Sequence, residues 1–168
     1  MHETPDELRH LQHLLDESAA AAGPHLRSIV TAERRLTAEQ LCRRLQGMRL
    51  LAVATVTSDG RPLVGPVDGY FLHGAFHFGS GRDSVRIRHL AARPAVSATH
   101  LESEQLAVTV HGRAELFALS DPEHPELRQA MLDHYVPLQG PAFATWLDQA
   151  DSIGVKIAAT KLFTFSQA

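Results

Sequence analysis

Apolar residues in the first part of the chain recur with the spacing of an α-helix. Four leucines between residues 8 and 15 fall every three or four positions, which places them along one side of a helix. This spacing predicts a helix over residues 5–22, and a shorter stripe predicts a second helix over residues 37–47. In the second stripe Thr37, followed three residues later by Gln40, resembles the capping box that begins many helices.

Beyond residue 50, apolar and polar residues alternate as they do in half-buried β-strands. Ser58-Asp59-Gly60 and His73-Gly74 interrupt this alternation with residues typical of tight hairpin turns. Consecutive strands joined by tight turns pair antiparallel, so the first three strands are expected to form a meander. The predicted strands cover residues 50–57, 61–72, 75–78, 95–101, 106–117 and 153–166.

Helical patterns separate the later strands, so we expect a mainly β protein with α-helices, of the α+β class. They predict helices over residues 83–92, 122–135 and 141–149. Six strands with short turns and one inserted helix favour a small six-stranded antiparallel β-barrel, closed or partly closed. We therefore expect two parts, a helical N-terminal extension over residues 1–47 and a barrel domain over residues 48–168.

Composition and charge exclude several classes of protein. With 44% hydrophobic and 21% charged residues among 168, the chain has the composition of a globular domain. A formal net charge of −3 and a pI near 6.4 argue against a protein whose main role is to neutralise nucleic-acid phosphates. No apolar run reaches the roughly 18 residues that span a bilayer. We therefore expect neither nucleic acid nor a membrane as a partner.

The start of the chain and its cysteine content favour a cytoplasmic protein. Residues 1–7 are acidic and lack the basic and apolar regions of a signal peptide. The single cysteine, Cys42, excludes an intramolecular disulfide and a cysteine-rich zinc site, and we expect a buried, inert thiol. His10 and His13 are a feasible ligand pair on a helix, but no third ligand follows at a familiar spacing, so we predict no metal site.

One short segment carries the residue types of an anion site. Gly79-Ser80-Gly81 is predicted to turn the chain out of a strand and into the helix over residues 83–92. Unpaired N–H groups and the positive end of the helix dipole favour a bound anion at such a helix start. The segment is therefore the first candidate for a phosphate-binding site.

The side chains around this helix start strengthen that interpretation. The spacing predicts that Arg82 and Arg86, four residues apart, face the same side of the helix, and guanidinium groups suit bidentate contact with phosphate. The alternative is an ordinary solvated basic helix, capped by Asp83. The hydroxyl and basic side chains in question are those of Ser80, Arg82, Ser84, Arg86 and Arg88.

Five motifs occur in an order that resembles a known family. They are an apolar strand with an Asp-Gly-Arg-Pro turn (51–62), Val-Gly-Pro-Val (64–67), Phe-His-Phe-Gly-Ser (76–80), a helix between Ser-Val-Arg and Arg-Pro-Ala-Val (84–96), and Val-His-Gly-Arg-Ala-Glu-Leu (110–116). In this order they resemble the FMN-binding split barrel of the pyridoxamine 5′-phosphate oxidase-like superfamily. That superfamily includes the flavin- and deazaflavin-dependent oxidoreductases.

The resemblance implies which residues hold a cofactor. Its phosphate would be bound where the third strand gives way to the helix, by Gly79, Ser80, Arg82, Ser84 and Arg86. The backbone of a strand segment would contact the flavin ring, at Gly65, Pro66, Val67 and Asp68. Val85 departs from the family pattern, because the B6 oxidases have a second basic residue there.

The function implied is hydride transfer between a bound cofactor and an unknown small organic substrate. FMN is the cofactor expected first, deazaflavin coenzyme F-420 is the alternative, and haem is a third possibility because related split barrels bind it. The family also implies a homodimer with the cofactor between the subunits. A non-catalytic protein that stores or carries flavin or haem is the competing interpretation.

Several candidate catalytic residues have a simpler structural interpretation. Residues 163–168 lack the arginine- and histidine-bearing motif with which the B6 oxidases grip their substrate, so we do not expect pyridoxamine phosphate oxidation. Tyr70 and His73 follow the ring-contacting segment, but we interpret both as structural and assign no catalytic residue. Trp146 belongs to an apolar helical cluster, interpreted first as core and second as a lid or a dimer contact.

Overall fold

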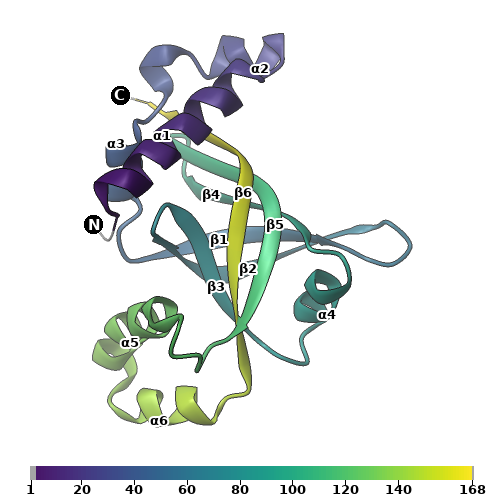
Figure 1. Ribbon diagram of the computed structural model, residues 1–168, viewed down its shortest axis with the longest axis vertical. Helices are drawn as coiled ribbons and strands as arrows, with labels where there is room; N and C mark the ends of the chain where they lie inside the picture. The colour runs from purple at the N-terminus through teal and green to yellow at the C-terminus, as the bar shows by residue number, and fades with distance from the viewer. Residues whose placement is uncertain (1–2, 168) are drawn as a thin grey trace.

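The computed structural model describes residues 3–167 and shows an antiparallel barrel flanked by helices (Figure 1). Met1 and His2 of the predicted extension, and Ala168 of the predicted barrel domain, lie outside the described residues. The strands are β1 (Met48–Val56), β2 (Pro62–Leu72), β3 (Ala75–Gly81), β4 (Ala95–Glu102), β5 (Leu106–Ala118) and β6 (Ser152–Ser166). The helices are α1 (Pro5–Ala20), α2 (Pro24–Ile29), the 3-10 helix η1 (Ala32–Arg34), α3 (Ala38–Arg44), α4 (Val85–Ala92), α5 (Pro125–Gln139) and α6 (Ala142–Gln149).

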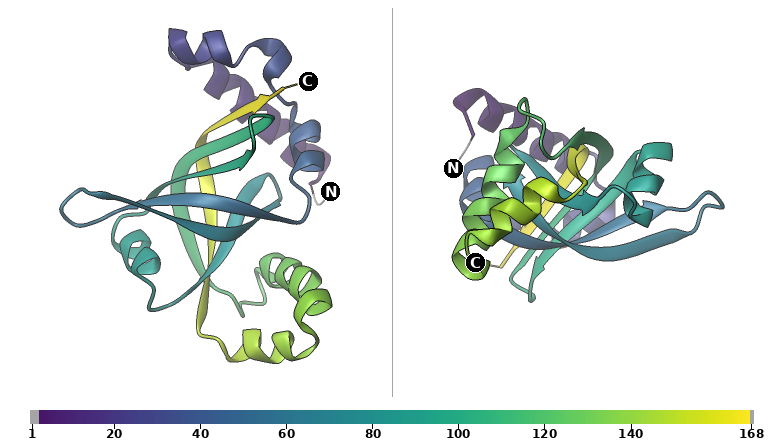
Figure 2. Two further views of the ribbon diagram at one scale, coloured as in Figure 1. Left: turned by 180° about the vertical axis from the view of Figure 1, so that it is seen from behind. Right: turned by 90° about the horizontal axis from the view of Figure 1, so that it is seen from below.

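The six strands close on themselves in the order β1-β2-β3-β6-β5-β4. Every neighbouring pair is antiparallel, and β6 completes the barrel because it pairs with both β3 and β5. The predicted α+β class and the six-stranded antiparallel barrel are confirmed. Figure 2 shows that the β1–β2 hairpin projects beyond the barrel, with its tight turn at the far end.

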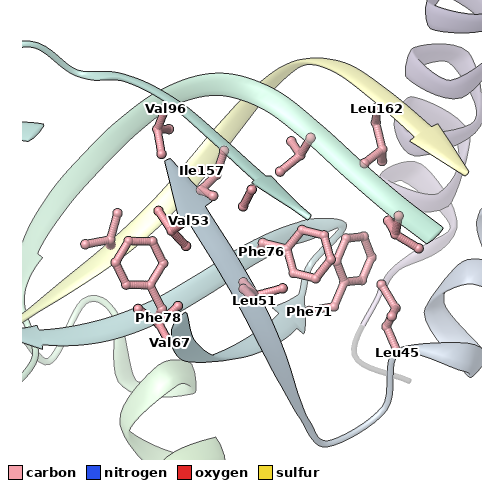
Figure 3. Close-up of a cluster of buried hydrophobic side chains, with 14 of the residues drawn as sticks. Leu45, Leu51, Val53, Val67, Phe71, Phe76, Phe78, Val96, Ile157 and Leu162 are labelled. Atoms are coloured by element: carbon pink, nitrogen blue, oxygen red, sulfur yellow. The ribbon is translucent and has the colours of Figure 1, made fainter. Parts of the chain in front are cut away.

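The barrel interior is filled by the inward-facing side chains of all six strands. Leu51 and Val53 of β1, Phe76 and Phe78 of β3 and Ile157 of β6 are almost fully buried and converge in one cluster (Figure 3). Alternate residues of a strand point to opposite faces, so the outward residues of the same strands remain available for other contacts. This alternation is what places the site residues described below.

The N-terminal extension packs against the barrel through α1 and α3. The side chains of Leu11 and Leu15 are buried, and the backbone N–H of Leu162 in β6 donates to Ser18 Oγ over 2.9 Å. The capping box predicted at Thr37 is present. Helix α2 was not predicted, because a Gly-Pro pair indicates a stop, although proline is equally suited to the first turn of a new helix.

Helices α5 and α6 lie at the end of the molecule opposite α1 and α2 (Figure 1). They cover outward-facing Tyr70 and Leu72 of β2 with a second apolar cluster that includes Leu127, Phe143 and Leu147. None of the helices within residues 3–167 is long and apolar enough to cross a bilayer. The consequence for function is that α5 and α6 are fixed beside β2.

Candidate functional site

The site begins where β2 and β3 stop pairing with each other. Their paired positions run from Leu72–Ala75 at the turn to Gly69–Phe78. Beyond that point β2 continues beside β1, while residues 79–81 continue beside β6. We call this divergence of β2 residues 64–68 from β3 residues 79–81 the split.

The predicted turn at residues 79–81 is wrong, because these residues are the last of β3. Gly79, Ser80 and Gly81 pair with Gly154, Ile153 and Ser152 of β6. Glycine fits an extended strand as well as a turn, so pairing with a distant strand decides the conformation. The consequence is that Ser80 is held by a sheet rather than by a mobile loop.

The edge of β2 that faces the split presents backbone polar groups. Pro66 has no N–H to give to a neighbouring strand, and its carbonyl oxygen instead accepts a hydrogen bond from Arg86 Nη2 over 3.3 Å. Backbone groups alternate in direction along an antiparallel strand, so Val64 presents its N–H and C=O on the same edge. This edge can therefore hydrogen-bond a planar polar ring.

Gly65 makes room for Arg86 at this edge. A Cβ atom at residue 65 would lie 2.8 Å from Arg86 Nη2, closer than side-chain carbons approach other heavy atoms. Arg86 is partly buried, and burial lowers the pKa of its guanidinium from the usual value. None of the ion pairs within residues 3–167 involves Arg86, so its charge is available to an anion.

Two serine hydroxyls meet at the start of α4. Ser80 Oγ donates to Ser84 Oγ over 3.0 Å, and Ser84 Oγ accepts from the N–H of Ile87 over 3.2 Å. Ser84 is therefore the N-cap of α4, and the cap at Asp83 that belonged to the alternative interpretation is wrong. Because the side chain of Ser84 caps the N–H of Ile87, the first two N–H groups of the helix, those of Val85 and Arg86, have no partner within the helix.

Arg82 lies outside the helix and points elsewhere. Its Nε is 2.7 Å and 2.8 Å from the two carboxylate oxygens of Asp151, which immediately precedes β6. The prediction that Arg82 and Arg86 share a helical face is wrong, because α4 begins only at Val85. The role of Arg82 as a phosphate ligand remains a prediction.

The two remaining ring-segment residues point in opposite directions. Val67 is buried in the barrel core, so only its backbone is open to a ligand. The side chain of Asp68 points outward, where its carboxylate accepts a hydrogen bond from the hydroxyl of Tyr135 in α5. Burial, and then this bond to Asp68, raise the pKa of Tyr135 to about 12, so the hydroxyl keeps its proton at neutral pH.

Helix α5 also reaches the other side of the split. The Sδ and Cε atoms of Met131 lie 3.5 Å from the position of a Cβ at Gly79. Asp68 on β2 and Gly79 on β3 are thus both contacted by α5, which bridges the point where the two strands diverge. The sequence gives no local signal for these contacts, because residues 68 and 135 are far apart along the chain.

The other residues considered from the sequence have structural surroundings. His73 Nδ1 lies 3.1 Å from Glu7 of α1. Tyr70 is buried, which raises the pKa of its hydroxyl, and that hydroxyl has no hydrogen-bond partner within residues 3–167. Cys42 is buried as predicted, and burial raises the pKa of its thiol to about 12. In the described part of the chain, no three potential metal ligands gather.

Comparison with solved structures confirms the fold. A protein described as an F-420 reductase is 24% identical over 70% of this chain and 91% of its own, with a TM-score of 0.54. A FAD-binding protein from Mesorhizobium loti is 19% identical over 80% and 98%, with a TM-score of 0.58. HutZ, the heme storage protein of Vibrio cholerae, is 18% identical over 79% and 95%, with a TM-score of 0.62. At these identities the similarity establishes the fold alone.

A search of curated proteins found no match. The family model for pyridoxamine 5′-phosphate oxidase, in contrast, matches residues 37–163, from the N-cap of α3 almost to the end of β6. This range contains every residue assigned above to the split and to the start of α4. The chain therefore belongs to the pyridoxamine 5′-phosphate oxidase family.

Proposed function

We propose that this protein is an oxidoreductase that binds FMN along the split and transfers hydride to or from a small organic substrate. The observation that carries the proposal is the meeting of Ser80, Ser84 and Arg86 at the start of α4, directly beside the unpaired edge of β2. A phosphate and a polar ring joined in one molecule match these two adjacent features.

The phosphate end fits the residues at the start of α4. Arg86 carries a positive charge without a carboxylate partner among the described residues, and it is partly buried. A bound phosphate would restore hydrogen bonds and charge balance to this group. Ser80 and Ser84 supply hydroxyls, and the free N–H groups of the first helical turn add the favourable dipole.

The ring end fits the edge of β2. The backbone of Val64, Pro66 and Asp68 would hydrogen-bond the polar edge of the ring, and Gly65, which has no side chain, lets Arg86 lie against the same strand segment. When bound, the flavin or deazaflavin supplies the hydride chemistry itself. The contribution of the chain is to fix the ring, to exclude water from one side and to place the substrate on the other.

We propose a homodimer in which the cofactor lies between the subunits. Leu50 on β1, Val64 on the projecting hairpin and Leu101 on β4 are large aliphatic side chains that are 59%, 69% and 61% exposed. Ala52 of β1 pairs with Thr99 of β4, so Leu50 and Leu101 lie near each other on one outward face. A second copy would cover this face. Sedimentation velocity should show a dimer for the unmodified chain and a monomer for Leu101→Asp.

The names of the structural neighbours support a flavin-type cofactor without selecting one. The FAD-binding protein supports a flavin, the class to which FMN belongs, and the F-420 reductase supports the deazaflavin. The heme storage protein supports the second candidate function, a carrier that binds without turnover. Titrating the apoprotein separately with FMN, coenzyme F-420 and haem, followed by absorbance, selects among them. We expect FMN to bind most tightly, and binding of haem alone would overturn the proposal.

A turnover assay separates an enzyme from a carrier. Protein loaded with reduced FMN is mixed with a panel of organic electron acceptors, and the return of the oxidised flavin spectrum is followed over time. We expect at least one acceptor to reoxidise the bound flavin faster than it reoxidises free reduced FMN. Equal rates for bound and free flavin across the panel would support the carrier.

A further inference from the structure

A pocket of about 510 Å³ lies between β2 and the helices α5 and α6. Asp68 lies at one end, and the side chains of Met131, Tyr135, Phe143 and Trp146 form the walls. We call it the aromatic pocket. The ring centroids of Tyr135 and Phe143 are 4.8 Å apart and those of Phe143 and Trp146 are 5.3 Å apart, so three rings run in a row away from Asp68.

The polar end of the aromatic pocket carries a negative charge. Asp68 takes part in none of the ion pairs within residues 3–167, and its one hydrogen bond there comes from the hydroxyl of Tyr135. The Tyr135 hydroxyl already donates its proton in the hydrogen bond to Asp68. Toward a ligand, both the hydroxyl and the carboxylate therefore offer only acceptor oxygens. The pocket therefore favours a ligand with a positive charge or N–H donors and disfavours an anion.

The exposure of Trp146 has no structural explanation in the packing of α6. Phe143 and Leu147 anchor this helix and are 8% and 4% exposed, whereas Trp146 is 57% exposed. An exposed indole at the open side of a pocket provides a large flat surface for stacking, and tryptophan is the best aromatic partner for a cation. Trp146 is therefore placed to cover a ligand, not to complete the core.

We infer that the aromatic pocket binds a planar aromatic cation. The exposed face of the Trp146 indole would stack on its rings and stabilise its charge, with Phe143 packed behind the indole. The carboxylate of Asp68 would pair with the cation at the other end of the pocket. An uncharged molecule of the same shape gains only the stacking. An anion of that shape is repelled by Asp68.

The position of the pocket connects it to the split. Asp68 belongs to the β2 segment assigned to the cofactor ring, and Met131, on the pocket wall, contacts Gly79 across the split. The binding inference depends on the pocket alone. We also infer that the bound cation is the reactant, which makes planar organic cations the substrate class. This second step rests on the proposed function.

The test uses the fact that Trp146 is the one tryptophan in the sequence. Full-length protein is titrated at pH 8 with three probes of similar shape: the cation 1-methylquinolinium, uncharged quinoline and the anion 2-naphthoate. Quenching of tryptophan fluorescence is corrected for probe absorption, and isothermal calorimetry gives an independent affinity. We expect saturable binding that is tightest for the cation and weakest for the anion.

Two variants of the same chemical type decide the role of Asp68. Asp68→Asn removes the charge and keeps an acceptor for Tyr135. We expect it to lower the affinity for 1-methylquinolinium about tenfold and to leave the affinity for quinoline unchanged. Asp133→Asn makes the same change on exposed α5 outside the aromatic pocket and should alter neither affinity. Equal affinities for cation and neutral probe, or no effect of Asp68→Asn, would overturn the inference.

Parallel titrations with FMN and coenzyme F-420 keep the two proposals separate. If the protein binds 1-methylquinolinium as expected but neither cofactor, the pocket stands and the proposed function fails. If it binds FMN but binds 1-methylquinolinium no more tightly than quinoline, the proposed function stands and the inference fails. If both bind, we expect the cation to alter the absorption spectrum of protein-bound FMN in the native protein and to do so at higher concentration in Asp68→Asn.

Discussion

The phosphate site at the start of α4 can be tested by removing two of its three side-chain contacts together. The double variant Ser84→Ala, Arg86→Ala deletes one hydroxyl and one guanidinium at the cofactor phosphate. A hydrogen bond to a charged group contributes about 1.5–3 kcal/mol, so the pair contributes about 3–6 kcal/mol. The dissociation constant of FMN should therefore rise roughly a hundredfold to ten-thousandfold, measured by fluorescence titration of the apoprotein.

Ser84 has a second role that must be separated from cofactor binding. Its hydroxyl caps α4 through the N–H of Ile87, so Ser84→Ala alone should lower the free energy of unfolding by about 1 kcal/mol. Ser84→Asp keeps a good helix cap but places a negative charge at the phosphate. It should preserve stability in urea denaturation and still weaken FMN binding at least as much as Ser84→Ala.

Arg88 provides the matched control for the loss of Arg86. It lies in the same helix two residues further on, is exposed, and donates to the carbonyl oxygen of Asp83 over 2.7 Å. Arg88→Ala should change FMN affinity less than about threefold, well under 1 kcal/mol. If the double variant keeps its FMN affinity within that same factor, the phosphate does not lie at the start of α4 and the reasoning is refuted.

Three further predictions concern packing and titration. Gly65→Ala places a methyl group 2.8 Å from Arg86 Nη2 and displaces the guanidinium, so FMN affinity should fall about tenfold with little change in melting temperature; an unaltered affinity would contradict the placement of Arg86. In Gly112→Ala the new Cβ would lie 2.1 Å from the carbonyl oxygen of Ala158, so the free energy of unfolding, measured by urea denaturation, should fall by at least about 2 kcal/mol. In Gly81→Ala the new Cβ has open space around it, so the free energy of unfolding should fall much less. Burial lowers the pKa of His77 to about 4, below the unfolded value of about 6.5. The unfolded chain therefore takes up the proton first, and the free energy of unfolding should fall by about 2 kcal/mol from pH 7 to pH 5; the same pH slope in His77→Gln would assign it to other groups.

Much of the fold could be predicted from short-range patterns. The turn at His73-Gly74 is a two-residue hairpin in which both residues have positive φ, as expected for a turn of this composition. The capping box at Thr37 identified the start of α3 to within one residue. These features depend on neighbours in sequence, so they can be read without knowing the tertiary structure.

The errors arose where a distant partner decided the outcome. Residues 79–81 became strand because β6 lies beside them, and Arg82 turned toward Asp151, which is 69 residues away. The hydrogen bond between Asp68 and Tyr135 likewise spans 67 residues. Ser80, Ser84 and Arg86 could be predicted as a site because they are close along the chain. The position of α5 at the split could not be predicted, because it depends on contacts between residues far apart in the sequence.

Closure of the barrel by β6 has a consequence for the order in which the protein forms. The meander of β1, β2 and β3 assembles from neighbouring segments, but β3 and β5 acquire their shared neighbour only when residues 152–166 have been synthesised. Helix α1, which is synthesised long before β6, also docks on this strand, through a hydrogen bond that spans 144 residues. Such long-range closure slows folding and leaves strand edges exposed during translation, so the nascent chain should depend on chaperones until the ribosome has released residue 166.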